Sequence, residues 1–115
     1  MNIKQVFEQH PEGFTLNTNP LRIEFKKEGF YVSLTNNKFK DLEEAEEVFI
    51  RSLKVLNALS TNPDNKKVGG WKDREGNLYL DATLWVETEE EAIIIARLFQ
   101  QKAYYDIKYR CGVEL

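Results

Sequence analysis

The spacing of apolar residues changes along the chain and predicts strands in some segments and helices in others. Residues 21–25, 30–34 and 78–86 alternate apolar and polar side chains, the period of a half-buried strand. Residues 41–60 and 88–101 repeat apolar side chains at steps of three and four, the period of a helix with one buried face. The pattern therefore predicts a mixed α+β domain.

The N-terminal segment is predicted to hold a short helix and a hairpin. Residues 2–9 place apolar side chains at helical spacing, and Pro11 ends that element. Residues 14–16 form a short β-prone piece. Residues 21–34 read as two alternating strands joined by a turn, with Gly29 placed for a positive φ angle. We expect these two strands to pair with each other.

Two helix starts carry capping signals. Asp41 with Glu44, and Thr88 with Glu91, have the spacing in which one side chain caps the helix and the other returns the hydrogen bond. The first helix is expected to end near Ser60. The second, expected to extend to residue 101, is apolar over more than half its circumference. We therefore expect it to pack on the sheet and to touch a further element or a partner.

Three more strands are predicted in the C-terminal half. Residues 68–72 contain Gly69 and Gly70, which indicate a bulge or a close backbone approach. Residues 78–86 form the strongest strand, and residues 103–109 the last one.

From residue 29 onward, the predicted order is strand, helix, strand, strand, helix, strand. This βαββαβ order is that of a ferredoxin-like two-layer sandwich, with helices on one face of the sheet. The right-handed crossover rule then places residues 103–109 parallel to another strand of the same sheet. We predict an α+β two-layer sandwich, ferredoxin-like or a close variant with an extra N-terminal hairpin. Residues 1–115 are predicted to form a single domain, since 115 residues suffice for one core.

Composition and charge narrow the cellular setting. The net charge is −3, so the basic footprint of a general nucleic-acid binder is missing. The lone Cys111 excludes an internal disulfide and is typical of a reducing compartment. The first seven residues do not resemble a signal peptide, and no apolar run reaches the ~20 residues of a membrane span. The sequence predicts a cytoplasmic protein without a membrane partner.

The chain contains no evident catalytic or metal-binding pattern. His10 has no nucleophile context, and one histidine with one cysteine are too few ligands for zinc. Asp73, Asp81, Asp106 and the Glu87–Glu91 cluster are the carboxylates that could in principle build a metal site or an acid/base pair. Asp81 and Asp106 are expected to share the open face of the sheet, whereas the acidic residues in the first helical turn already have a structural explanation in the helix dipole and cap. We predict a protein that is not an enzyme and has no cofactor or metal.

Aromatic residues gather on the face of the sheet that the helices are expected to leave open. Tyr31, Tyr79, Trp85 and Tyr104 have the outward parity of their strands, and Asp81 shares it. These five residues are the predicted binding face. One interpretation is that residues 1–25 or another protein chain cover it.

The other interpretation of this face is binding of single-stranded RNA or DNA. An aromatic sheet face in a βαββαβ fold resembles the RNA-recognition fold, in which bases stack on such rings. Tyr31 and Tyr79 would be the stacking residues. The acidic net charge and the carboxylate of Asp81, which repels phosphate, disfavour this alternative.

Two blocks of sequence resemble a known group of proteins. One combines Gly13-Phe14-Thr15-Leu16 with Gly29-Phe30-Tyr31-Val32-Ser33, and the other runs from Gly70-Trp71 through Tyr79-Leu80-Asp81 to Tyr105-Asp106. Together they resemble small uncharacterised proteins encoded by bacterial phages, prophages and plasmids. The resemblance implies an accessory protein of a mobile element that binds a host factor, and it implies no functional residue.

These observations favour a protein-interaction module, acting as a homodimer or on a host or phage partner. One specific form is an inhibitor of a bacterial defence system, whose acidic clusters such as residues 89–91 imitate nucleic acid toward a basic target. Tyrosine and tryptophan are enriched at interface hot spots, which supports this reading.

Overall fold

The computed structural model describes residues 2–59 and 62–115, which form an α+β fold. The helices are α1 (Ile3–Gln9), α2 (Ala45–Leu59) and α3 (Glu89–Leu98), with short 3-10 helices η1 (Leu42–Glu44) and η2 (Pro63–Asn65). The strands are β1 (Phe14–Thr18), β2 (Leu21–Ile23), β3 (Phe30–Ser33), β4 (Lys38–Phe39), β5 (Lys66–Lys72), β6 (Leu78–Val86), β7 (Ala103–Asp106) and β8 (Cys111–Glu114). The predicted α+β class is confirmed.

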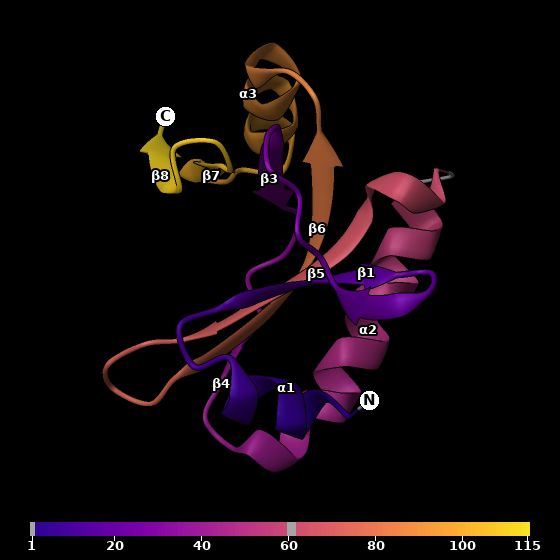
Figure 1. Cartoon of the computed structure of the whole chain (residues 1–115), viewed down its shortest axis with the longest axis vertical. Helices are drawn as coiled ribbons and strands as arrows, with labels where there is room; N and C mark the ends of the chain where they lie inside the picture. Colours follow the sequence, from indigo (N-terminus) through magenta and orange to yellow (C-terminus); the bar gives the residue numbers. More distant parts are fainter. Residues whose placement is uncertain (1, 60–61) are drawn as a thin grey trace.

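Within the described residues, eight strands form one antiparallel sheet in the order β2-β1-β5-β6-β3-β7-β8, with β4 pairing to β6. The long β5–β6 hairpin runs through the middle of the molecule (Figure 1). Since β6 and β7 both pair antiparallel with β3, these two strands run in the same direction. The expectation that the segment after α3 is parallel to another strand of the sheet is therefore confirmed.

The predicted hairpin over residues 21–34 is wrong. β2 pairs with β1, whereas β3 pairs with β6 and β7. Alternation identified both segments as strands, but a strand pattern does not specify the partner. Val32 in β3 is fully buried, and such a side chain belongs in the middle of a sheet. Gly29 does adopt the expected positive φ, +99°.

The helices cover a single face of the sheet. α1 and α2 pack against Leu16, Val68 and Leu80, while α3 packs against Val32 and Val86. The register puts these strand residues on one side, because Leu80 and Val86 are an even number of positions apart in β6 and Val32 is paired with Leu84. In Figure 1, α1 lies at the lower end of the molecule, α2 runs up one side from there, and α3 with β7 and β8 lies at the upper end.

The helix starts follow the capping signals in different ways. Thr88 and Glu91 form the predicted pair: the Glu91 amide donates to Thr88 Oγ1 (3.2 Å), and the Thr88 hydroxyl donates to Glu91 Oε1 (2.8 Å). Asp41 instead accepts from the amide of Glu43 (2.9 Å) and caps η1. α2 begins after η1 and is described to Leu59; the predicted stop at Ser60 lies outside the described residues.

The second half of the chain brings three corrections. β5 pairs with β6 without interruption, so the glycines mark no bulge; Gly70 instead admits the Phe14 ring, whose Cζ would lie 2.3 Å from an added Cβ. α3 ends at Leu98 rather than at residue 101. The last predicted strand ends at Asp106, and β8 then adds an edge strand that the sequence did not predict. None of the helices in the described residues has the length and apolarity to cross a membrane.

Candidate functional site: the open face of the sheet

The face of the sheet opposite the helices carries four of the five predicted binding residues. Tyr79, Asp81 and Trp85 alternate with buried side chains along β6, and Tyr31 in β3 is paired directly with Trp85. All four side chains are partly exposed. These four residues therefore lie on the face that strand parity predicted.

Tyr104 is the exception, and its predicted place on the open face is wrong. The side chain is buried (5% exposed) in the core beneath α3 and packs edge-on against Phe30, with ring centroids 5.8 Å apart. Its hydroxyl donates to Glu89 Oε2 (2.7 Å), and burial together with this acceptor raises the pKa of Tyr104 to about 12. The register explains the error: Tyr31 is paired with Tyr105, so Tyr104 points to the opposite side.

Two aromatic residues of the open face were missed by the sequence analysis. Trp71 (48% exposed) stacks on Tyr79 with ring centroids 4.4 Å apart and planes 9° from parallel, and Tyr105 (40% exposed) stacks on Tyr31 at 6.4 Å. The parity of β5 relative to β6 identifies Trp71, but only once the register is known. Two stacked aromatic pairs thus lie on the open face.

A groove of about 610 Å³ is hollowed into this face. Gly69 is paired with Asp81 in the register. Because glycine has no side chain, none projects from this position into the groove. The residues that line the groove are Glu12, Gly13, Phe14, Thr15, Tyr31, Ser33, Gly69, Gly70, Trp71, Asp81, Thr83, Ala103, Tyr104 and Tyr105. Two of these lining residues are acidic, and none is lysine, arginine or histidine. The groove is therefore an aromatic and acidic surface.

Asp81 is the half-buried carboxylate of the groove. Its Oδ1 accepts hydrogen bonds from the Thr35 hydroxyl (2.8 Å) and from the backbone amide of Asn37 (2.7 Å). These two bonds tie the segment after β3 to β6. Burial raises the pKa of Asp81 above its usual range, against the effect of these two hydrogen bonds. Among the described residues, no lysine or arginine pairs with Asp81. Asp106, expected to share its face, lies on the other side of the sheet, since it is paired with Phe30.

The Tyr79 ring is held by the turn of the β5–β6 hairpin. Its hydroxyl donates to Asp73 Oδ2 (3.1 Å), and Asp73 Oδ1 accepts from the amides of Glu75 and Asn77 (2.9 Å each). The side-chain amide of Asn77, with these further donors, lowers the pKa of Asp73. Asp73 is thus a structural carboxylate that organises the turn and orients one aromatic ring.

The other end of the open face is covered by residues 24–28, which we call the strap. It leads from β2 at the sheet edge to β3, and it passes over Trp85, whose Nε1 donates to the Glu28 carbonyl (3.0 Å). Lys26 Nζ lies 4.3 Å from the centre of the Trp85 ring, a cation–π contact. Of residues 1–25, α1 packs on the helical side, where Phe7 meets Phe14 (ring centroids 5.0 Å apart). The expected cover by residues 1–25 is therefore not found over Trp85, because the strap residues that contact this ring, Lys26 and Glu28, lie beyond that range. Within the range, Glu24 reaches the open face at Lys67.

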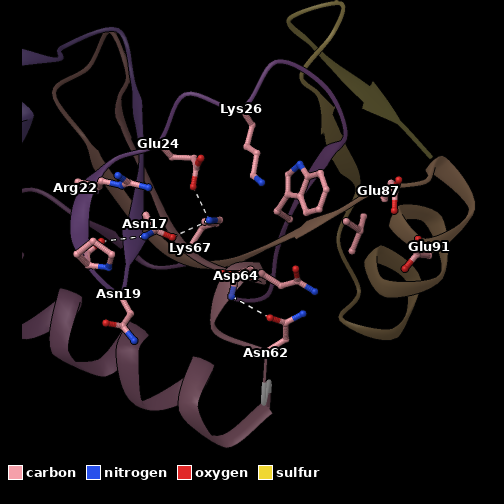
Figure 2. Close-up of a pocket in the computed structure, with 14 residues that line it drawn as sticks. Asn17, Asn19, Arg22, Glu24, Lys26, Asn62, Asp64, Lys67, Glu87 and Glu91 are labelled. Atoms are coloured by element: carbon pink, nitrogen blue, oxygen red, sulfur yellow. Dashed lines mark hydrogen bonds and ion pairs between the residues drawn. The ribbon is translucent and has the colours of Figure 1, made fainter.

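Beneath the strap lies a lysine whose side chain is buried. Lys67 is only 2% exposed, and its Nζ donates to Asn17 Oδ1 (2.8 Å) and to Glu24. Figure 2 shows Glu24 and Asn17 converging on the ammonium group. A buried lysine requires such partners. In the sequence Lys67 follows Lys66 and precedes Val68, and this position gives no signal of its burial.

The second cavity of about 640 Å³ opens beside this ion pair (Figure 2). Its lining is polar and mixed in charge, with Arg22, Lys26 and Lys67 facing Glu24, Asp64, Glu87 and Glu91. Lys67 is already bound by Glu24 and Asn17. This cavity therefore presents no single charge to a ligand.

Tyr31 lines the groove and also lies within the electrostatic influence of Glu24 in the strap. Burial raises the pKa of its hydroxyl well above the ordinary value, and the negative charge of Glu24 in the strap raises it further. The phenol is therefore neutral throughout the physiological range and acts as a ring and a hydrogen-bonding group rather than as a base.

The remaining candidates for chemistry lie apart from the groove. His10 ends α1, where its amide donates to the Val6 carbonyl (2.9 Å). Cys111 is an exposed thiol on the edge strand β8. The part of the chain that the structure describes contains no cluster of three or more histidine, cysteine or carboxylate side chains able to hold a metal ion.

Comparison with known proteins adds no further constraint. The chain matches no protein-family model, no curated protein and no solved structure.

Proposed function

We propose that the protein is a non-enzymatic interaction module that binds another protein chain through the open face of its sheet. The observation that carries this proposal is the groove between the two stacked aromatic pairs, Trp71 with Tyr79 and Tyr31 with Tyr105. Exposed tryptophan and tyrosine rings around a hollow are typical of interface hot spots. The strap leaves this end of the face uncovered.

Affinity capture with identification by mass spectrometry tests the proposal. The full chain would be compared with Trp71→Ala and with the control Ile50→Ala, an equally exposed change on the helical side. We expect a defined partner that Trp71→Ala loses and Ile50→Ala keeps. A monodisperse monomer in light scattering, with no partner captured, would contradict the proposal.

A homodimer is the second form of this function. Ile94 and Leu98 lie one turn apart on α3 and are 52% and 73% exposed, because α3 contacts the sheet through the small side chains of Ala92 and Ala96. This exposed pair supports the expectation that α3 touches a further element. If light scattering gives a dimer mass, Leu98→Glu is expected to return it to the monomer.

We also infer that the protein is an accessory protein of a mobile element, with a bacterial defence system as its target. The acidic residues at the start of α3 support this form, but two of them have structural roles: Glu89 accepts from Tyr104, and Glu91 pairs with Thr88. Glu90→Lys is therefore the suitable variant. We expect the wild type to rescue a phage from a defence system and this variant to rescue less.

Single-stranded nucleic acid is the alternative, and the exposed rings of Trp71 and Tyr105 are the observation in its favour. The groove has two acidic residues and no basic one to meet phosphates. Tryptophan fluorescence titrated with mixed oligonucleotides at low salt separates the two functions. No change at low salt ends the nucleic-acid alternative.

For the fold, we propose a variant of the ferredoxin-like two-layer sandwich. The four strands of the βαββαβ order form one continuous block, β5-β6-β3-β7, and both connecting helices pack on its same face. On this proposal β1 and β2 extend one edge of the sheet and β8 the other. An experimental structure in which α2 and α3 cover opposite faces would contradict it.

A further inference from the structure

Asp81 has one carboxylate oxygen and a negative charge that its structural role does not use. Both anchoring donors, the Thr35 hydroxyl and the Asn37 amide, use the same oxygen, Oδ1. Among the described residues, the second oxygen, Oδ2, accepts no hydrogen bond, and no cation pairs with the group. An asparagine would supply the same anchoring oxygen without the cost of placing a charge in a half-buried site. The negative charge of Asp81 is therefore left without a counter-charge among the described residues.

The aromatic rings around Asp81 are suited to bind a cation that is flat and has an apolar surface. Trp71 and the Tyr31–Tyr105 pair line the groove whose floor holds Asp81. Aromatic ring faces attract cations, and a guanidinium group both stacks on such rings and donates to a carboxylate. Glu12 adds a second negative charge to the lining, and no lining residue opposes it. The groove is therefore complementary in charge to an arginine side chain, and its rings offer surfaces on which a guanidinium group can stack.

We propose that the groove binds an arginine side chain of a protein partner, with the guanidinium paired to Asp81 between the rings of Trp71 and Tyr31. This inference rests on the proposed function and names the chemistry of the partner segment. It also explains why the groove is acidic where a nucleic-acid surface would be basic. The two tryptophans report on it separately, because Trp71 lies in the groove and Trp85 lies under the strap.

The test is an NMR titration of the ¹⁵N-labelled full chain at low salt with the end-blocked peptide Gly-Ser-Arg-Ser-Gly. The matched control peptide has citrulline, the neutral isostere, in place of arginine. We expect the arginine peptide to shift the indole N–H signal of Trp71 and to leave that of Trp85 in place. The citrulline peptide should shift neither. Equal shifts with both peptides, or a response at Trp85 alone, would overturn the proposal.

Two variants complete the test. Asp81→Asn keeps the oxygen that anchors Thr35 and Asn37 and removes the charge, and we expect it to weaken binding about tenfold, as loss of a charge-assisted hydrogen bond does. Trp71→Ala removes an exposed ring and should weaken binding without unfolding the chain. Unchanged affinity in Asp81→Asn with a native-like spectrum overturns the proposal. If Asp81→Asn is misfolded, unchanged affinity in Trp71→Ala does so.

The outcome also separates this inference from the proposed function. If neither peptide binds but a captured partner is still lost by Trp71→Ala, the arginine proposal is wrong and the interaction face stands. If neither peptide binds and Trp71→Ala keeps every captured partner, both are wrong.

Discussion

The two ends of the open sheet face differ in whether a charged side chain has a partner of opposite charge. At the strap end, Lys67 is enclosed and matched by Glu24 and Asn17. At the groove end, Asp81 receives two neutral donors, and none of the described lysine or arginine side chains pairs with it. The first arrangement is complete within the chain, whereas the second becomes complete when a cation enters the groove. A charge that the fold leaves unmatched is therefore a better guide to a binding site than a charge that is merely buried.

The largest expected effect breaks the complete end. Lys67→Met leaves Glu24 and Asn17 without their cation, and we expect it to lower the free energy of unfolding by about 3 kcal/mol, as for other broken buried pairs. Lys66→Met is the control, since Lys66 makes only an exposed hydrogen bond to Asn57. Urea denaturation measures both. Equal losses in the two variants would contradict the importance of the buried pair.

The next effect concerns the strap. Gly29 has φ +99°, and an added Cβ would lie 2.4 Å from Trp85 Nε1. Gly29→Ala should therefore displace the indole from the Glu28 carbonyl and cost about 2 kcal/mol through strain and overpacking. Gly76→Ala is the matched control, because Gly76 also has a positive φ (+87°) but has no atom within 4 Å of the added Cβ.

Thermal unfolding with tryptophan fluorescence compares these two glycine variants. We expect Gly76→Ala to lower the free energy of unfolding by only about 1 kcal/mol, the cost of holding a non-glycine residue at a positive φ angle. If both variants lose the same amount, Gly29 is not required by its contact with Trp85.

A smaller effect of opposite sign is expected at the groove end. Asp81→Asn keeps the anchoring oxygen and removes a charge that burial disfavours, so we expect the free energy of unfolding at pH 7 to rise by less than about 1 kcal/mol. Combined with weaker arginine binding, this gain marks a residue retained for function rather than for stability. A clear loss of stability would instead make Asp81 a purely structural anchor.

The stability of the folded chain should depend on pH through the carboxyl group of Asp81. The pKa of this carboxyl is raised in the folded state, so the folded chain holds its proton to a higher pH than the unfolded chain does. The cost of the charge is therefore complete above the raised pKa, and it disappears as the pH falls through that pKa to the unfolded value. We expect the stability advantage of Asp81→Asn to shrink over the same interval in urea denaturations run from pH 7 downward.

The smallest effect sharpens the comparison between the two tryptophans. Trp71 is 48% exposed in the groove, whereas the indole of Trp85 is bonded to the strap. Trp71→Phe should change stability by no more than about 0.5 kcal/mol. Acrylamide quenching of tryptophan fluorescence measures the exposure of each ring in turn. The Trp85→Phe variant, whose only tryptophan is Trp71, should be quenched more strongly than the Trp71→Phe variant, whose only tryptophan is Trp85. The reverse order would show that the strap does not cover Trp85.

Part of the site was predictable, and the limits follow from the register. Alternation along β6 put Tyr79, Asp81 and Trp85 on the correct face, since side chains in a strand alternate strictly. Tyr104 and Tyr105 are adjacent, so a shift of one residue exchanges their faces, and only pairing with β3 decides which ring is buried. Trp71 required the register of β5 against β6, and the burial of Lys67 required contacts from β1 and the strap.

The sequence by itself determined the elements that depend on neighbouring residues: the α+β class, the positions of most strands, the cap at Thr88 and the positive φ of Gly29. The tertiary structure alone decided which strands pair, because hydrogen bonds between strands are the same for every sequence. It therefore decided that β2 joins β1, that the strap covers one end of the open face, and that Asp81 lies in a groove beside exposed aromatic rings.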